Sequence, residues 1–191
     1  MKIGLILVDI QKDYFPGGRM ELVAMKEASE KAREMLLFFR EKKCPIFHIQ
    51  HIAVRDGATF FLPNSVGMEI HENVNPLFGE TIIQKHHPNS FLKTKLHEEL
   101  LKAGIESVVI CGAMSHMCID ATTRAAADLG FQCTVVHDAC ATKDLIFGDK
   151  TVSAEMVHSA FMAAFQSVYA KVMDLNSFAS WMIQSFSNLP G

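Results

Sequence analysis

The chain has 191 residues, of which 49% are hydrophobic and 20% are charged, and its net charge is −3. These fractions are ordinary for a folded globular protein and exclude a disordered one, while the weak negative charge gives no basic surface for nucleic acid. No apolar run reaches the ~18 residues of a membrane span. We therefore expect one globular domain over residues 1–191, with neither nucleic acid nor membrane as a partner.

Short apolar, β-branched segments alternate with helical patterns along the chain. The expected strands are Ile3–Asp9, Pro45–His51, Thr81–Lys85, Ser107–Gly112, Gln132–His137 and Val168–Met173. The expected helices are about Val23–Lys42, Ser90–Lys102, His116–Leu129, Thr151–Gln166 and Ser177–Ser185. This alternation predicts right-handed βαβ crossovers and a three-layer α/β/α sandwich with a six-stranded, mainly parallel, Rossmann-like sheet. The irregular stretch 52–80 is long enough to be a lid or binding loop.

Cysteines in the chain are scattered and odd in number. They lack the paired spacing of a zinc site, and a disulfide framework fits them poorly. The N-terminal apolar run is too short for a signal peptide, because Asp9 follows it at once. A reducing cytoplasm suits this pattern, so we expect a cytoplasmic protein.

Three chemically useful side chains follow the ends of predicted strands. Asp9 ends the first strand, Lys85 ends the third, and Cys118 follows the fourth. Each residue alone has an ordinary interpretation, as a turn residue, a solvated amine or a small buried apolar side chain. Ligands of an open parallel sheet bind beyond the carboxyl ends of its strands, so an acid, an amine and a thiol are expected to meet there.

The segment GAMSHMCID, residues 112–120, joins the fourth strand to an alanine-rich helix. Ser115 is expected to cap this helix and Gly130 to end it. Cys118 then lies in the first turn, where the helix dipole and Lys85 are expected to lower the pKa of its thiol. The inward stripe of the helix is expected to be Ala121, Ala125 and Leu129.

With these features the sequence resembles the isochorismatase-like cysteine hydrolases, which include nicotinamidases and other amidohydrolases. The resemblance covers nearly the whole chain and rests on VDIQKDYFPGG, GMEIHENVNP, IIQKHHPNSFLKTKL, VVICGAMSHMCIDATTRAAADLGF and VVHDACAT. It implies a catalytic triad of Asp9, Lys85 and Cys118. It also implies a cis peptide between Ala113 and Met114, and an oxyanion hole made by the N–H groups of Met114 and Cys118.

The implied reaction is hydrolysis of a small neutral amide, imide or carbamate through a thioester on Cys118. Isochorismatases proper lack this cysteine, which argues against that branch. Two alternatives stay open, a metal-dependent nicotinamidase-like amidase and a non-catalytic binding member of the fold. A thiol redox protein is a further rival, although no second cysteine lies near Cys118 in sequence.

A metal site is not expected, and neither is any cofactor. Nicotinamidases hold their metal with an Asp-x-His pair, which FHIQHIAVRDGATFF lacks. His48 and His51 are three apart and face opposite ways on a strand, although a partial cluster with His71 remains open.

Aromatic side chains are expected to line the substrate pocket. They are Phe15, at the aromatic position of the family, Phe91 after Lys85, and Phe60 and Phe61 in the long loop. Arg19 and Arg55 are isolated, so they mark no anionic substrate. The segment VHSAFMAAFQ is apolar almost all round, which favours a homo-oligomer, a dimer or a tetramer.

Overall fold

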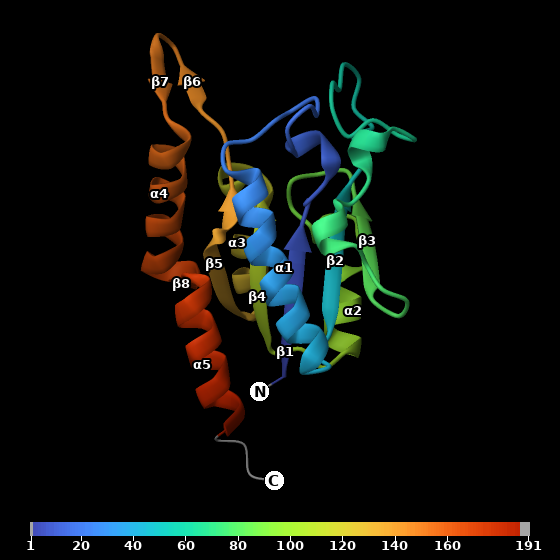
Figure 1. The fold of residues 1–191 in the computed structure, drawn as a ribbon, viewed down its shortest axis with the longest axis vertical. Coiled ribbons are helices and arrows are strands. Elements are labelled where there is room, and N and C mark those ends of the chain that lie inside the picture. The colour runs from blue at the N-terminus through green and yellow to red at the C-terminus, as the bar shows by residue number, and fades with distance from the viewer. Residues whose placement is uncertain (1, 188–191) are drawn as a thin grey trace.

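The computed structural model describes residues 2–187 and has six parallel strands at its centre (Figure 1). The strands are β1 (Ile3–Val8), β2 (Ile46–His51), β3 (Thr81–Lys85), β4 (Ser107–Ala113), β5 (Gln132–Ala141) and β8 (Lys171–Met173). Their order is β3-β2-β1-β4-β5-β8, and every neighbouring pair is parallel. All residues of β1 and β4 are buried, as strands covered on both faces must be. The predicted fold class is confirmed.

Helices cover both faces of this sheet. They are α1 (Met25–Glu41), α2 (Leu96–Lys102), α3 (Asp120–Asp128), α4 (Ala154–Ala164) and α5 (Leu175–Ser187). The chain runs from β1 outward to β3, returns to β4 and then continues the other way, so right-handed crossovers place α1 on one face and α2 and α3 on the other. α5 joins α1, and the Phe39 and Phe178 rings stack 6.1 Å apart. Figure 1 shows α1 crossing in front of the sheet.

The reversal of strand order falls between β1 and β4, which are neighbours in the sheet. Their following segments leave toward opposite faces, and this opens a crevice beyond their carboxyl ends. Gly112, near the end of β4, has a φ of +123°, and a Cβ there would collide with the carbonyl oxygen of Val8. Only glycine therefore allows β4 to pass this close to β1 at the crevice.

Several of the predicted elements have different bounds, and β5 runs on to Ala141 instead of ending at His137. α2 begins at Leu96 rather than Ser90, because residues 89–95 form turns in which the buried Ser90 hydroxyl lies 2.7 Å from that of Thr122. The last strand is shorter, since residues 165–169 are π-helical. α4 starts at Ala154, because β7 (Lys150–Val152) pairs with β6 (Leu145–Phe147) in an unpredicted hairpin.

The helix after β4 is also rotated relative to the prediction. Residues 115–119 form a π-helical turn, in which Ile119 N–H donates to the carbonyl of Met114, five residues earlier. One extra residue per turn shifts the buried face, so the inward residues of α3 are Thr122, Thr123 and Ala126 rather than Ala121, Ala125 and Leu129. Ser115 does not cap the helix, whereas Gly130 follows its C-terminus with a φ of +92° as expected.

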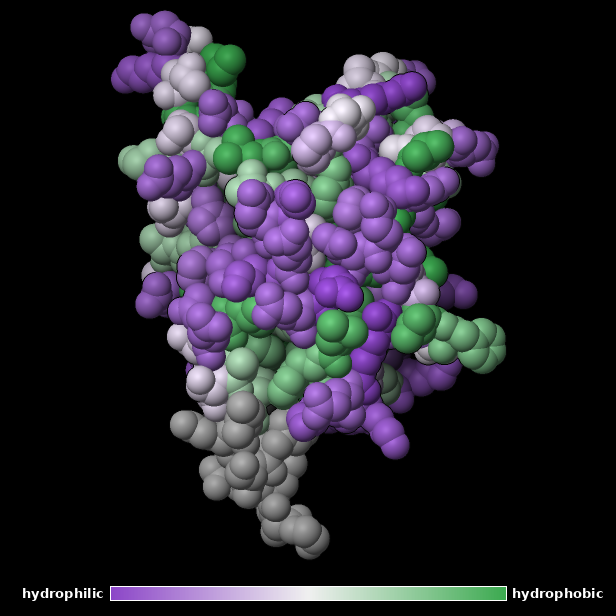
Figure 2. Space-filling model, viewed as in Figure 1, coloured by the Kyte–Doolittle hydropathy of each residue, from purple (hydrophilic) through white to green (hydrophobic). Residues whose placement is uncertain are grey.

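The β6–β7 hairpin stands away from the body of the protein, at the upper left of Figures 1 and 2. Hydrophobic and hydrophilic side chains lie next to one another there, and Ile146 and Phe147 are 78% and 85% exposed. Exposed apolar groups of this kind are compatible with a homo-oligomer, which stays a prediction. Among the described residues, no helix combines the length and the apolarity that crossing a bilayer requires.

Candidate active site

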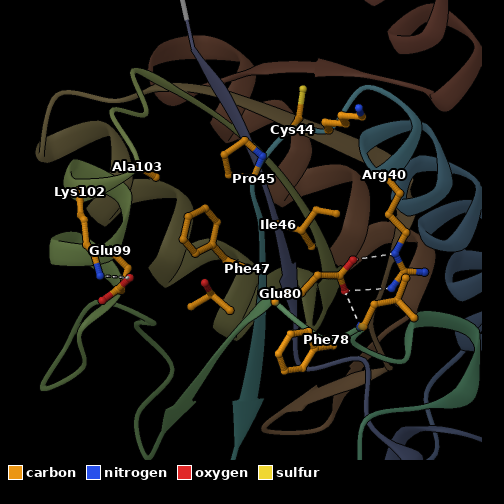
Figure 3. A pocket seen from close by; sticks show the side chains of 14 residues that line it. Arg40, Cys44, Pro45, Ile46, Phe47, Phe78, Glu80, Glu99, Lys102 and Ala103 are labelled. Atoms are coloured by element: carbon orange, nitrogen blue, oxygen red, sulfur yellow. Dashed lines mark hydrogen bonds and ion pairs between the residues drawn. The ribbon is translucent and has the colours of Figure 1, made fainter.

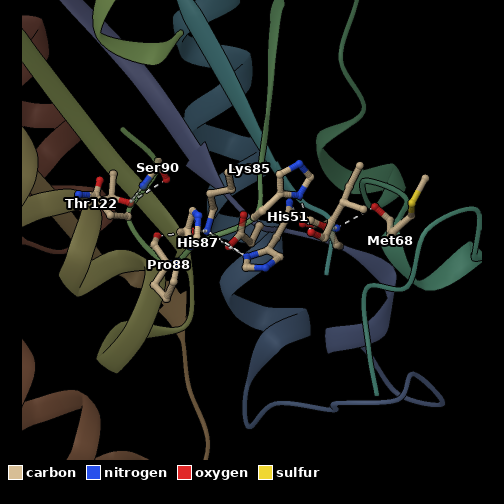
Figure 4. A network of polar contacts seen from close by, with 12 residues as sticks. His51, Met68, Lys85, His87, Pro88, Ser90 and Thr122 are labelled. Carbon is tan, nitrogen blue, oxygen red and sulfur yellow. Dashed lines mark hydrogen bonds and ion pairs between the residues drawn. The ribbon is translucent and has the colours of Figure 1, made fainter. Parts of the chain in front are cut away.

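Asp9 and Lys85 form a buried ion pair beyond the carboxyl ends of β1 and β3. Lys85 Nζ lies 2.7 Å from Asp9 Oδ2, and both side chains are 0% exposed. Asp9 has a φ of +51°, an uncommon conformation for a non-glycine residue, which directs the chain sharply away from β1. Lys85 Nζ also donates to the carbonyl oxygens of His87 and Pro88, at 3.1 and 3.2 Å (Figure 4). The amine is thereby fixed on several sides.

Cys118 lies beside this pair, in the π-helical turn that follows β4. Its sulfur, an oxygen of Asp9 and a ring nitrogen of His51 all lie within 4.8 Å of one another. The structure therefore brings Asp9, Lys85 and Cys118 together at the crevice. His51, the last residue of β2, joins them, although the predicted site does not include it. Its Nδ1 lies 3.3 Å from Lys85 Nζ and 3.9 Å from Asp9 Oδ2.

The charges of the site follow from its burial. Burial lowers the pKa of Lys85, but the Asp9 carboxylate and Cys118 outweigh it, and the net direction is upward. Burial also lowers the pKa of His51 to about 4, so its ring is neutral at neutral pH and Nδ1 accepts from the lysine. The resting pair is therefore an ammonium and a carboxylate with a neutral imidazole beside them.

The expected lowering of the Cys118 pKa is wrong. Burial raises the pKa of this thiol, the Asp9 carboxylate raises it further, and the Lys85 ammonium only partly opposes them. The start of a helix was visible in the sequence, but the depth at which the sulfur lies was not. The proton accordingly rests on sulfur in the unliganded protein, with an ionised carboxylate beside it.

Alkylation of Cys118 by iodoacetamide should therefore be slow at pH 7 and should rise about tenfold per pH unit, in step with the thiolate fraction. Cys44 should be labelled first, because it is partly exposed and burial raises the pKa of its thiol less than that of Cys118. Mass-spectrometric mapping between pH 6 and pH 9 measures both rates. A rate at Cys118 that is fast and independent of pH would instead show a resting thiolate.

A cavity of about 150 Å³ opens onto the thiol. One wall of the cavity is apolar and is formed by Ala53, Val54, Ala58, Phe60, Met114 and Met117. Polar side chains that reach it are those of Tyr14, His51, Arg55 and His86. Arg55 was set aside as an isolated residue, yet it is exposed at this cavity.

Of the four aromatic residues predicted for the pocket, only Phe60 lines this cavity. Phe61 is fully buried behind it, with its ring 4.6 Å from that of Tyr14. Phe15 stacks on His71 with ring centroids 3.6 Å apart, and Phe91 packs against Phe131. The short helical turn Lys12–Tyr14 and the turns of 89–95 direct Phe15 and Phe91 away from this cavity, so their role in a substrate pocket stays a prediction.

Two buried polar residues hold the 52–80 loop over the cavity. Asp13 Oδ2 accepts from the N–H of Phe61 at 2.6 Å. The Gln11 amide donates to the carbonyls of His51 and Met68, and its oxygen accepts from the N–H of His51. These bonds fix the loop to the end of β2, so the wall beside the thiol is formed without further ordering.

Comparison with known proteins shows to which family the chain belongs. The family model described as "Isochorismatase domain" matches residues 4–177. The chain belongs to the isochorismatase family. YddQ of Bacillus subtilis, described as an uncharacterized isochorismatase family protein, is 51% identical over 93% of this chain and 99% of its own. The structure of an isochorismatase from Pseudomonas putida is 36% identical, with a TM-score of 0.86 over 92% of this chain and 89% of that one.

A streptothricin hydrolase of Streptomyces noursei is a more distant relative. It is 32% identical over 146 residues, which are 74% of this chain and 50% of that protein. Relatives with different printed names therefore match this chain, and family membership by itself leaves the substrate open.

The segment before Cys118 carries the backbone feature that the resemblance implied. The peptide bond between Ala113 and Met114 is cis. The Met114 carbonyl accepts from the N–H groups of Met117 and Ile119, and Met114 itself lines the cavity. The backbone of Met114 is thus placed next to the thiol.

The possible metal cluster of His48, His51 and His71 does not form. His48 is buried on the other face of β2, where its Nε2 lies 2.8 Å from Glu80 Oε2. His71 lies in the loop against Phe15, and its Nδ1 accepts from the N–H of Asn73. Within residues 2–187, the one grouping with the spacing of metal ligands is Asp9, His51 and Cys118, the side chains of the candidate active site itself.

A larger pocket of about 650 Å³ lies at the opposite end of the sheet, beside the starts of β2 and β3 (Figure 3). Its main polar feature is the Arg40–Glu80 ion pair, with Arg40 Nε 2.7 Å from Glu80 Oε1. Glu80 also accepts from the N–H of Leu77, and Arg40 donates to the carbonyl of Asn75. Arg40 and Glu80 already have hydrogen-bond partners within the chain, so we propose neither a ligand nor a reaction for this pocket.

Proposed function

We propose that the protein hydrolyses an amide-type C–N bond of a small substrate through a thioester on Cys118. The observation that carries the proposal is the fully buried Asp9–Lys85 pair beside the thiol at the mouth of a small cavity. Burying two charges is costly, and hydrophobic residues of similar volume would do as well for stability. An ionised carboxylate next to a neutral thiol is, however, the arrangement that a general base needs.

The first half-reaction transfers the acyl group to sulfur. Asp9 takes the thiol proton as Sγ attacks the carbonyl carbon, and the negative charge moves to the carbonyl oxygen. The N–H groups of Met114 and Cys118 are the proposed donors to that oxyanion. Asp9 then gives the proton to the leaving nitrogen, the C–N bond breaks, and an amine or ammonia departs.

The second half-reaction returns the free enzyme. Asp9 accepts a proton from water while the water oxygen attacks the thioester, the C–S bond breaks, and the acid product leaves. The proton on Asp9 returns to the sulfur. Lys85 Nζ, 2.7 Å from Asp9 Oδ2, holds the carboxylate in place between steps.

The streptothricin hydrolase relative supports the coarser part of this proposal, hydrolysis, and does not specify the bond. Our proposed substrates are small amides, imides and carbamates, because the cavity of about 150 Å³ admits only a compact group. A screen of such compounds, with the Cys118→Ala variant as the blank, tests the proposal. A parallel arm with EDTA tests the metal-dependent alternative, which a loss of activity restored by zinc would favour.

A further inference from the structure

The buried ion pair does not reach the cavity beside it. Asp9 and Lys85 are both 0% exposed, and neither lines the cavity that opens onto Cys118. A substrate in the cavity can touch the thiol, whereas the carboxylate and the ammonium lie behind the cavity wall. Asp9 can still take the thiol proton directly, because one of its oxygens lies within 4.8 Å of Sγ. The leaving nitrogen, however, lies in the cavity, so a proton from the pair needs a path to it.

His51 is the side chain that connects the pair to the cavity. Apart from the reacting thiol, it is the one side chain of residues 2–187 that both lines the cavity and lies within hydrogen-bond distance of Lys85 Nζ. Its Nδ1 is 3.3 Å from that amine (Figure 4). The side chain is 17% exposed, so the opposite edge of the ring, with Nε2, opens onto the cavity. A ring nitrogen also lies within 4.8 Å of the Cys118 sulfur.

The hydrogen bond to Lys85 fixes which nitrogen of His51 carries the proton. An ammonium can only donate, so Nδ1 accepts and the proton of the neutral ring is on Nε2. Lys85 Nζ has four acceptors for its three N–H bonds, namely Asp9 Oδ2, His51 Nδ1 and the carbonyls of His87 and Pro88. It can therefore lose the bond to His51 and keep three partners. The imidazole thus presents a donor to the cavity and an acceptor to the ammonium, as a proton relay requires.

We propose that His51 is a catalytic residue that relays protons between the Asp9–Lys85 pair and the substrate. This inference rests on the proposed function of the same site and specifies how the proton of Asp9 reaches the leaving nitrogen. As the C–N bond breaks, Nε2 gives its proton to that nitrogen and Nδ1 takes a proton from Lys85 Nζ. Lys85 in turn takes the proton that Asp9 received from the thiol. The pair is again an ammonium and a carboxylate, and His51 now carries its proton on Nδ1.

The relay runs in the opposite direction in the second half-reaction. Nε2 of His51 now has a free lone pair toward the cavity, so it accepts a proton from water as the water oxygen attacks the thioester. Nδ1 returns its proton to Lys85, and Lys85 passes a proton to Asp9. The C–S bond breaks, the acid product leaves, and Asp9 protonates the sulfur of Cys118. Each group then has the protons with which it began.

An ester whose leaving group needs no proton separates the two halves of this cycle. In 4-nitrophenyl acetate the leaving group departs as the 4-nitrophenolate anion. With enzyme in excess, the absorbance of that anion measures acylation, and mass spectrometry of the Cys118 peptide measures the later loss of the acetyl group. His51→Gln should be acylated at a rate within about threefold of the wild type. It should lose the acetyl group at least about a hundredfold more slowly, which is the usual contribution of a positioned acid–base group.

A second replacement separates proton transfer from hydrogen bonding. His51→Gln keeps an N–H donor near the position of Nε2, whereas His51→Asn keeps an acceptor near the position of Nδ1. Neither amide passes a proton from one of its atoms to the other, so both variants should slow deacylation alike. With an amide from the screen, acylation itself should slow by a similar factor. His97→Gln is the matched control, because this partly buried ring of α2 packs against Phe131 and lies outside the cavity, and both rates should stay within about threefold.

The outcomes separate this inference from the proposed function. If the His51 variants lose the acetyl group within about threefold of the wild-type rate, the relay is overturned and the thioester mechanism stands. If acylation by the ester slows as much as deacylation, His51 only supports the site, and the relay is again overturned. If wild-type protein is not acetylated on Cys118 at all, the proposed function fails and the relay fails with it. Unchanged acylation with slow deacylation supports the relay and also shows that the variants are folded.

Discussion

Replacing Cys118 with alanine should lower kcat/KM for any substrate of the site by at least about a thousandfold, because the covalent route disappears with the sulfur. The fold should survive. Cys118 is buried, but one small side chain replaces another, and the free energy of unfolding should fall by only about 1 kcal/mol. Initial rates across the amide panel and thermal unfolding measure the two effects.

Cys111→Ala is the matched control for this prediction. Cys111 is a fully buried cysteine of β4, outside the cavity, so its replacement costs similar packing and leaves the chemistry intact. Its kcat/KM should stay within about threefold of the wild type. Activity of Cys118→Ala within tenfold of the wild type would contradict a covalent mechanism.

Lys85→Met should both inactivate the protein and destabilise it. The substitution leaves the Asp9 carboxylate buried without its partner at 2.7 Å. Breaking a buried ion pair from one side is unfavourable by about 3–5 kcal/mol, which corresponds to a fall in Tm of roughly 10 °C for a chain of this length. Chemical denaturation and calorimetry measure the loss.

Two companion variants separate charge from packing. Adding Asp9→Asn to Lys85→Met removes both charges, so much of the lost stability should return while activity stays absent. Lys102→Met breaks the exposed Lys102–Glu99 pair, 3.9 Å apart on α2, and should change stability by less than about 0.5 kcal/mol. A Lys85→Met variant as stable as Lys102→Met would contradict a tightly coupled buried pair.

The residues gathered at the crevice were predictable because one rule covers them. Parallel strands end at the same edge of a sheet, so Asp9, Lys85 and Cys118 had to be near one another once their strands were identified. The same rule, applied to the last residue of β2, would have found His51. It was missed because the expected chemistry of a Cys–Asp–Lys site needs no imidazole.

Other features depend on local helical turns that shift by one residue which side chain faces inward. The sequence does not show these turns. The short helical turn Lys12–Tyr14 brings Tyr14 rather than Phe15 to the cavity. The π-helical turn before α3 moves its buried face onto Thr122, Thr123 and Ala126. The pKa of Cys118 depends on burial depth, which only the packed structure reveals.

Trapping the acyl-enzyme tests the central claim most directly. Wild-type protein is mixed with an amide found active in the screen, quenched in acid within the first turnovers, digested and examined by mass spectrometry. The account predicts that the peptide containing Cys118 gains the mass of the acyl group, that hydroxylamine removes it, and that Cys111 stays unmodified. Turnover with Cys118 unmodified at every quench time, or an acyl group on another residue, would contradict it.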